Sequence, residues 1–377
     1  MVTYQANLAA LLALCAALFA AHYKSPKQNL ATKASKASPE ASQHSFLLVY
    51  ALVMAADWLQ GPFLYSLYTE EHGIPSSLVS TLFTTGFLSG AASGYFTGST
   101  ADRRGRKAAC LFFCAAYSLS CLATMVPSIP ILFVGRVLGG VSTSLLFSVF
   151  DSWMVTDFHD RELAKKGGEL PRTFGTMSTL NSVVAIASGV VSEWLVTVTG
   201  TRKTPFAASV VLLGVAFWLI AVQWDENYGD TGDKKVEAQQ KQRTGGNKLW
   251  NTLSNTRVLS LGLASTMFEG SMYLFVFYWT PALRSTQTTA TGLPYGVIFA
   301  SFMASALAAS LAFNTIASSH IVRYSTLLIA ILATANICFF LSISPKSEQS
   351  TFWIFCLFEA TVGMYWPWMS LLNSDAP

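Results

Sequence analysis

The chain has 377 residues, of which 52% are hydrophobic and only 12% are charged, whereas soluble domains carry about 25% charged residues. Its net charge of +4 comes from Lys and Arg residues placed between long apolar blocks, which argues against a nucleic-acid surface. Because the six cysteines lie inside those blocks and no nucleotide-binding or hydrolase motif occurs, we expect an all-α, polytopic membrane protein that is not an enzyme and needs no cofactor or metal.

The first apolar block, 7–23, is short and rich in Ala and Leu. A secretory signal peptide has basic residues before its apolar segment and a small-residue cleavage site after it. Neither feature flanks this block, so we predict an extra N-terminal membrane helix over 1–23. A polar linker rich in Lys, Ser and Ala follows at 24–44.

Ten further blocks follow, each close to the 20 residues or so that cross a bilayer. One long polar segment separates six blocks from the last four, as the linker between two transporter halves does. We predict an N-terminal six-helix half at 45–223, a cytoplasmic central loop at 224–257 and an incomplete C-terminal half of four helices at 258–377. The predicted spans are 45–68, 78–97, 108–126, 131–155, 173–198, 206–222, 258–283, 296–317, 324–343 and 352–372.

Orientation follows from the loop charges. If the linker at 24–44 is cytoplasmic, the inner loops hold 19 of the 24 Lys and Arg residues and the outer loops hold only Arg202, Lys203, Arg284 and Lys346. Because Lys and Arg gather in cytoplasmic loops, we predict this orientation. Tryptophans near the helix ends fit an interfacial belt: Trp153, Trp194, Trp224, Trp353, Trp366 and Trp368.

The sharpest motif reads Gly-Ser-Thr-Ala-Asp-Arg-Arg-Gly-Arg-Lys over 98–107, in a predicted cytoplasmic loop. Its first glycine lets two helices approach closely, and its second permits a tight turn. Its aspartate can accept charge-assisted hydrogen bonds from the following arginines. We predict a latch that holds the cytoplasmic ends of the two halves together, whereas an ordinary basic loop would explain the cations but not the spacing. The latch residues are Gly98, Asp102, Arg103, Gly105, Arg106 and Lys107.

This spacing resembles the signature loop of the major facilitator superfamily. A second superfamily signature, Arg-x-x-Gly-Gly, occupies 136–140 in the fourth core helix. Asp151 lies near the cytoplasmic end of that helix, where an acid typically completes the charge cluster in this superfamily, so the resemblance adds Asp151 to the latch. The repeat of the loop expected at 314–325 in the second half is degenerate.

Four stretches narrow the resemblance. They are 48–68 (LVYALVMAADWLQGPFLYSLY), 98–107, 135–155 (GRVLGGVSTSLLFSVFDSWMV) and 268–283 (FEGSMYLFVFYWTPAL). Together they are similar to the molybdate-anion transporter family, and the similarity runs from about residue 46 to 368. It implies a major facilitator fold and a secondary active transporter that imports an oxyanion, molybdate by resemblance, by alternating access. The superfamily has twelve core helices, and this sequence has ten apolar blocks after the first, so we expect a truncated second half.

Ionisable residues inside apolar blocks are the candidate site, because a charge at membrane depth costs about 2.5–3.5 kcal/mol on insertion scales and usually marks function. Arg136 is the intramembrane cation, and a planar guanidinium suits a tetrahedral anion. We predict that Arg136 and Asn181 bind the substrate, although a structural arginine and an interhelical amide bond are the competing interpretations.

Asp57 and Glu269 lie near the middle of the first helix of each predicted half. Burial in a low-dielectric medium favours the neutral form of an acid, which is what proton coupling requires. We therefore predict that these two acids carry the coupling protons, with a purely structural hydrogen-bonded acid as the alternative. Glu193 and Glu359 fall nearer the outer face and receive no role, since their carboxylates can reach the headgroup layer.

Two other functions stay open. A major facilitator carrier of another small solute, a sugar or an organic ion, keeps the mechanism and changes the substrate. A truncated, non-transporting receptor or scaffold would use the central loop to bind a partner. In either case we expect the chain to lie in the lipid bilayer of the plasma membrane, with no nucleic-acid partner.

Overall fold

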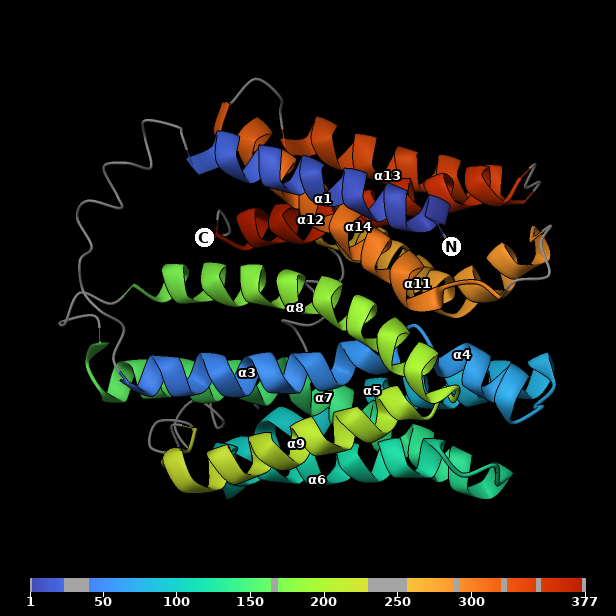
Figure 1. Ribbon diagram of the computed structural model, residues 1–377. Helices are drawn as coiled ribbons and strands as arrows, with labels where there is room; N and C mark the ends of the chain where they lie inside the picture. The colour runs from blue at the N-terminus through green and yellow to red at the C-terminus, as the bar shows by residue number, and fades with distance from the viewer. Residues whose placement is uncertain are drawn as a thin grey trace.

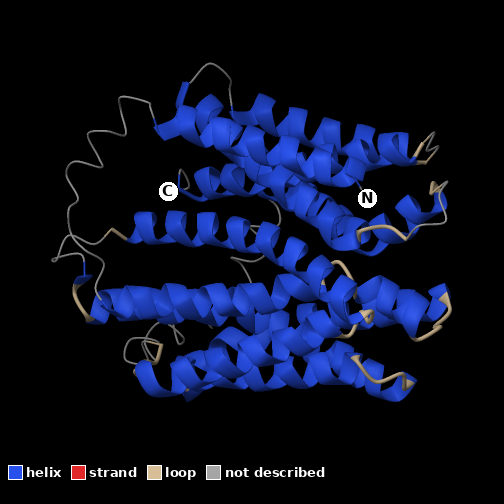
Figure 2. Ribbon diagram, viewed as in Figure 1, coloured by secondary structure: helices blue, strands red, loops and turns tan. Residues whose placement is uncertain are grey.

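The computed structural model describes residues 2–23, 41–163, 169–229, 256–287, 292–319, 324–343 and 347–374. Within these residues the chain is built of helices and short connections (Figure 2). The predicted linker at 24–40 and most of the predicted central loop, 230–255, lie outside the described residues. Every predicted apolar block overlaps a helix.

The first half begins with a broken helix. Its bent path, 44° at the break, follows a Gly-Pro pair at positions 61 and 62, and proline cannot continue the hydrogen bonding of a helix. The segment after the break ends in a π-helical turn, η1. Such turns are frequent at functional sites. The elements of this half are α3 (Ala41–Gln60), α4 (Leu64–Ser66), η1 (Leu67–Glu71), α5 (Ser76–Arg104), α6 (Arg106–Thr124), α7 (Ile129–Asp160), α8 (Leu170–Thr199) and α9 (Thr204–Gln223).

The second half holds α11 (Thr256–Ser285), α12 (Tyr295–Ser319), α13 (Tyr324–Ser342) and α14 (Glu348–Ser374). It lies above the first half in Figure 1. The packing repeats within each half, because α12 and α13 pack on α14 as α5 and α6 pack on α7. The two halves meet mainly where α8 packs against α12.

The N-terminal helix α1 (Val2–Tyr23) packs on the second half, against α12 (Figure 1). The Tyr4 hydroxyl donates a hydrogen bond to Glu348 at 2.6 Å. Further along, the Cys15 thiol donates to the Ala304 carbonyl oxygen at 3.2 Å. The helix is therefore an integrated part of the bundle.

Among the described residues, six helices are long and apolar enough to cross a membrane, or seven if the broken helix counts as one span. These include α1, α6, α7, α8, α9 and α12. α5 falls short because Ser, Thr, Gly and its terminal charges lower its hydropathy. The predicted tryptophan belt is wrong for Trp153, Trp224 and Trp368, which are at most 4% exposed.

Candidate functional site

Arg136 projects from α7 against the backbone of α5. Its Nε donates a hydrogen bond to the Leu82 carbonyl oxygen at 3.3 Å, and its guanidinium carbon lies 5.2 Å from the centre of the Phe83 ring. A side chain at Gly86 would place its Cβ 2.5 Å from a terminal nitrogen of Arg136, so glycine leaves the room that the guanidinium occupies. No carboxylate in the described part of the chain forms an ion pair with Arg136. Its terminal nitrogens can therefore donate to an anion.

Tyr68, on the π-helical turn η1, is a second polar group beside Arg136. Its side chain is fully buried and lies within electrostatic reach of the guanidinium. Across the described residues, its hydroxyl has no hydrogen bond of acceptable geometry. The His72 ring stacks on Tyr68 at 6.4 Å, while its Nε2 lies 3.0 Å from the Thr124 carbonyl oxygen. Because Thr124 and Arg136 both lie close to this hydroxyl, an anion bound at the guanidinium would also lie within its reach.

Asp57 lies in the middle of the broken helix. Its carboxylate accepts a hydrogen bond from the Tyr117 hydroxyl of α6. Tyr117 in turn lies within electrostatic reach of Arg136. The structure thus brings Asp57, Tyr117, Tyr68 and Arg136 into one polar cluster inside the first half.

Glu269 and Asn181 lie apart from that cluster. Glu269 is in the middle of α11 and accepts a hydrogen bond of 3.0 Å from the Tyr365 hydroxyl of α14. The Asn181 Oδ1 on α8 accepts a hydrogen bond of 2.7 Å from the Trp58 indole, and the Trp58 ring packs against α12. Asn181 thus ties α8 to α3, whose Trp58 in turn contacts α12, and in the described residues no contact joins Asn181 or Glu269 to Arg136.

The signature loop folds back on its own half. Arg106 binds the Asp102 carboxylate at 2.8 Å and also reaches α7, where it donates to the Ser152 carbonyl oxygen at 3.2 Å and to the Thr156 hydroxyl. Gly105 has φ +108°, a backbone conformation that side chains disfavour. These contacts join α5, α6 and α7 at one end of the bundle.

The segment 224–229, which follows α9, packs against this loop. The Glu226 carboxylate accepts hydrogen bonds from the backbone N–H groups of Lys107 at 2.8 Å and Ala108 at 3.1 Å. An acid at this position satisfies otherwise unpaired donors and favours the helix dipole at the start of α6. Trp224 stacks on Trp153 of α7, with ring centres 3.8 Å apart. The predicted central loop therefore begins with a docked segment.

Three other residues of the predicted latch lie in surroundings that differ from those of Asp102 and Arg106. Arg103 is exposed, and a side chain at Gly98 would meet open space. Asp151 is half-buried on α7, and among the described residues no ion pair connects it to the loop. The additional acids near the loop are Asp157 and Asp225, which both bind Arg161, at 2.7 and 2.9 Å.

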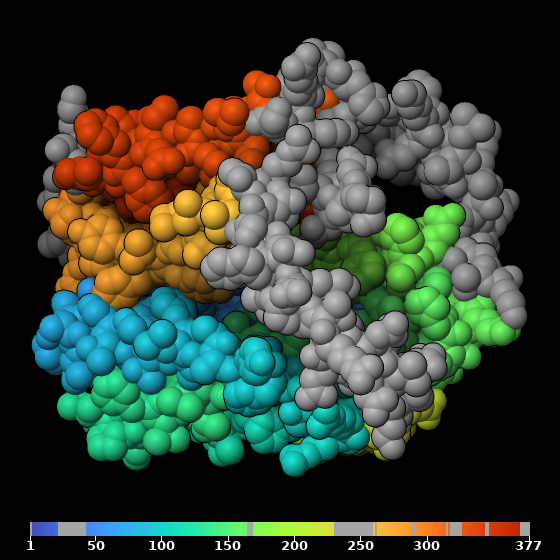
Figure 3. Space-filling view, turned by 180° about the vertical axis from the view of Figure 1, so that it is seen from behind, coloured from blue at the N-terminus to red at the C-terminus, as the bar shows by residue number. Residues whose placement is uncertain are grey.

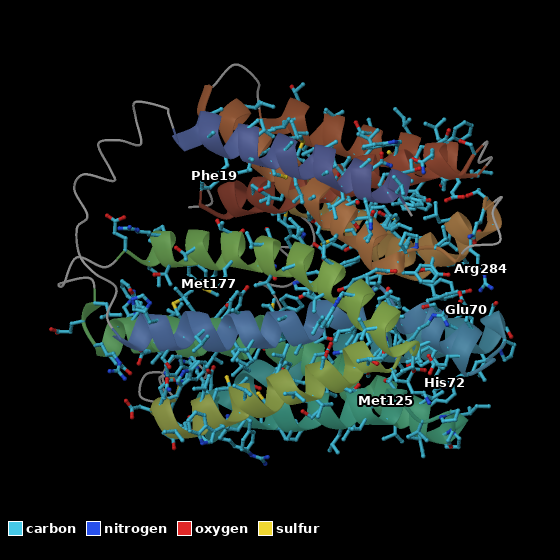
Figure 4. The ribbon with its side chains drawn as sticks, viewed as in Figure 1. Phe19, Glu70, His72, Met125, Met177 and Arg284 are labelled. Atoms are coloured by element: carbon cyan, nitrogen blue, oxygen red, sulfur yellow. The ribbon has the colours of Figure 1, made fainter. Side chains whose placement is uncertain are left out.

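The opposite end of the molecule holds a charged cluster centred on Glu70 of η1. Its carboxylate binds Arg202, from the connection between α8 and α9. It also binds Arg284, at the end of α11, at 2.9 Å, and accepts a hydrogen bond of 2.7 Å from the hydroxyl of Tyr295, which begins α12. Figure 4 shows Glu70 and Arg284 side by side at this end. Glu70 thus joins the two halves.

Comparison with known proteins decides the family. A family model described as sugar transporters with twelve transmembrane helices (MFS_5) matches residues 3–351. A molybdate-anion transporter of Xenopus tropicalis is 34% identical over 342 residues, which cover 88% of this chain and 72% of the relative. One from Danio rerio is 33% identical and covers 91% and 75%. This chain belongs to the molybdate-anion transporter family of the major facilitator superfamily.

Solved structures show the same fold. The nucleoside transporter NupG superposes with a TM-score of 0.65 at 10% identity, covering 89% of this chain and 82% of NupG. The inward open conformation of the xylose transporter XylE from E. coli superposes with a TM-score of 0.58 at 13% identity, covering 86% and 80%. The expected fold and family are confirmed, and this member of the molybdate-anion transporter family is a membrane transporter rather than an enzyme.

Hydrogen bonds join the two halves of this family member at the Glu70 end. Besides the Glu70 cluster they include one from the Gly296 backbone N–H to the Glu193 carboxylate, at 2.7 Å. Seen from behind, α11 lies directly against the chain around η1 at this end (Figure 3). The two halves are thus closed together at the predicted outer end.

Several residues of these sites could not be identified from the sequence of this molybdate-anion transporter family member. Tyr68 and Tyr117 are ordinary members of apolar blocks until their neighbours are known. Glu70 and Glu226 fall in predicted loops, where acids are common. The sequence alone does not indicate the π-helical turn or the position of the Tyr68 hydroxyl. Nor does it indicate that Glu226 lies at the start of α6, which is distant in the sequence.

Proposed function

We propose that this protein is a secondary active transporter that imports a small oxyanion across the plasma membrane by alternating access. Molybdate is the substrate that the names of its relatives suggest. The observation that carries the proposal is the Arg136 guanidinium, which has no carboxylate partner in the described residues and lies beside the buried Tyr68 hydroxyl.

The chemistry of Arg136 supports an anion. A guanidinium presents several N–H donors in one plane and binds carboxylate or phosphate oxygens through paired, charge-assisted hydrogen bonds. Its Nε is already used on the Leu82 carbonyl oxygen, so the terminal nitrogens are the donors that remain for a substrate. A neutral sugar would leave this positive charge in the membrane without compensation.

Charge balance supports proton coupling. Moving one elementary charge through 100 mV is worth about 2.3 kcal/mol, so a dianion entering against an inside-negative potential costs about 4.6 kcal/mol. At least two protons must accompany each dianion to remove that cost. Asp57, within the Arg136 cluster, and Glu269, in the second half, are the acids proposed to carry them.

Alternation requires contacts that form at one end and release at the other. The Glu70 cluster joins the halves at the predicted outer end, so the structure corresponds to a state closed on that side. The signature loop, with its Asp102–Arg106 pair, is proposed to form the corresponding latch at the cytoplasmic end. Its contacts to the second half remain a prediction.

Uptake of labelled molybdate into cells that express the chain, against vector controls, tests the proposal. We expect uptake above the control, inhibited by unlabelled molybdate and not by an excess of xylose. Uptake of labelled sugar in place of molybdate would favour the other carrier function, to which the description of the family model points. Uptake of neither, with the protein present at the cell surface, would favour a receptor or scaffold.

A further inference from the structure

Glu359 is a buried carboxylate in the second half to which no role has been given so far. It lies in the middle of α14, eleven residues from the helix start, or roughly 16 Å at 1.5 Å per residue. The residue is only 8% exposed, and among the described residues no hydrogen bond or ion pair reaches its carboxylate. The expectation that Glu359 reaches the headgroup layer is therefore wrong.

The internal repeat of the fold relates Glu359 to Arg136. In the first half, the position of Gly140 brings α7 so close to α5 that a Cβ would overlap the Gly86 carbonyl oxygen. In the second half, a Cβ on Gly363 would overlap the Ala306 carbonyl oxygen of α12 in the same way. Arg136 precedes the first glycine by four residues, and Glu359 precedes the second by four. The two charged residues thus occupy corresponding positions on the fourth helix of each half.

In the described part of the second half, no fixed cation is available to neutralise Glu359. The helices α12, α13 and α14 contain no Lys or Arg, and those of α11 lie only at its ends. Arg284, at one of these ends, already binds Glu70. An isolated charge in a low-dielectric interior is strongly unfavourable, so this carboxylate needs a mobile cation.

The groups around Glu359 favour a proton as that cation. On α14 the titratable neighbour is the Cys356 thiol, one turn away, and α13 contributes the buried thiol of Cys338. The facing helix α12 offers hydroxyl groups such as Ser305, and its one described titratable side chain, Tyr295, binds Glu70 at the outer end. From α11, Glu269 is held by Tyr365. No group of three or more acidic, Cys or His side chains that could hold a metal ion occurs in the described residues.

We propose that Glu359 is a proton-binding site of the second half, the acidic counterpart of the Arg136 anion site in the first. This inference rests on the proposed oxyanion transport, and it adds a carrier for the protons that a dianion requires. Glu359 differs from Asp57 and Glu269, which each accept a hydrogen bond from a tyrosine hydroxyl.

Labelling of the wild-type chain with a membrane-soluble carbodiimide, which reacts with protonated carboxyl groups, tests proton binding without any mutation. Peptide mass spectrometry should find Glu359 modified at acidic pH and several-fold less modified as the pH rises. Absence of modification at Glu359, or modification that Na⁺ suppresses and pH does not, would overturn the proposal. This readout does not depend on transport.

A transport assay is the second test of the role of Glu359. Glu359→Gln should retain exchange of labelled molybdate but lose accumulation driven by a pH gradient, whereas the matched control Glu348→Gln, on the same helix at its end, should accumulate as the wild type does. Full accumulation by Glu359→Gln would overturn the proposal while leaving oxyanion transport intact. Lack of uptake by the wild type would instead count against the proposed function, and carbodiimide labelling would still decide the role of Glu359.

Discussion

At the scale of single residues, the candidate anion site depends on Gly86, which has no side chain. The Arg136 guanidinium lies where the Cβ of any other residue at position 86 would be, 2.5 Å from a terminal nitrogen. Gly86→Ala should displace the guanidinium and lower the apparent affinity for molybdate, by about tenfold if one charge-assisted hydrogen bond of about 1.5 kcal/mol is lost. Gly94→Ala is the control on the same helix, because a Cβ there makes an ordinary contact of 3.5 Å. Equal affinities for the two variants, measured by concentration-dependent uptake, would refute this geometry.

The second prediction at the scale of single residues concerns Asp57. Asp57→Asn keeps the shape of the side chain and imitates its protonated form, and its amide oxygen can still accept the bond from Tyr117. We expect exchange of labelled molybdate down its own gradient to persist while accumulation driven by a pH gradient is lost. Accumulation by both Asp57→Asn and Glu269→Gln in reconstituted vesicles would leave these acids with a structural role only.

The sequence was informative about residues whose type conflicts with their surroundings. Arg136 and Asp57 stand out because a charge in an apolar block is costly. Glu70 does not stand out, because its partners Arg284 and Tyr295 are 214 and 225 positions away. Asn181 stands out in the same way, and the structure adds its bond to Trp58, which agrees with the alternative of an interhelical amide bond. Composition alone does not separate these cases.

At the scale of elements, the helices follow from apolar block length, whereas their ends depend on distant residues. The start of α6 is capped by Glu226, 118 positions away from Ala108. The segment 224–229 has the polar composition of a linker, so its docking could not be predicted from the sequence. Its position depends on the stacking of Trp224 on Trp153, which local sequence patterns do not record.

Removal of this cap is the prediction at the element scale. Glu226→Ala leaves the first backbone N–H groups of α6 without their acceptor, a loss of about 1 kcal/mol by analogy with side-chain caps. The thermal unfolding midpoint of the detergent-solubilised protein should therefore fall. Asp160→Asn is the control, because that acid is exposed at the end of α7. A midpoint for Glu226→Ala that matches the control would show that the hydrogen bonds of Glu226 contribute little to stability.

At the scale of the whole molecule, the two halves and their repeat were predictable from block count and from the signature loop. Which end is closed was not, because closure depends on the Glu70 cluster and on aromatic contacts between the halves. Phe277 of α11, for example, packs against Tyr65 and Phe83 of the first half. The sequence shows these rings, but not their partners.

Opening of the outer end is the prediction at this scale. Glu70→Gln removes the charge that attracts Arg202 and Arg284, so states open to the outside should become more populated. A cysteine at Phe277, below the cluster, should then react faster with an impermeant thiol reagent added to intact cells. The six native cysteines are all buried, which keeps the background low. Unchanged labelling in the Glu70→Gln background would mean that the cluster does not hold this end closed.

The central claim is that Arg136 holds the transported anion, and equilibrium binding of labelled molybdate to the purified chain tests it most directly. Arg136→Lys keeps the positive charge but loses the planar pair of donors. We predict that the wild type binds molybdate, that Arg136→Lys binds at least about tenfold more weakly, and that Arg103→Lys, a change at an exposed arginine, binds as the wild type does. Equal affinities for the wild type and Arg136→Lys would contradict the account.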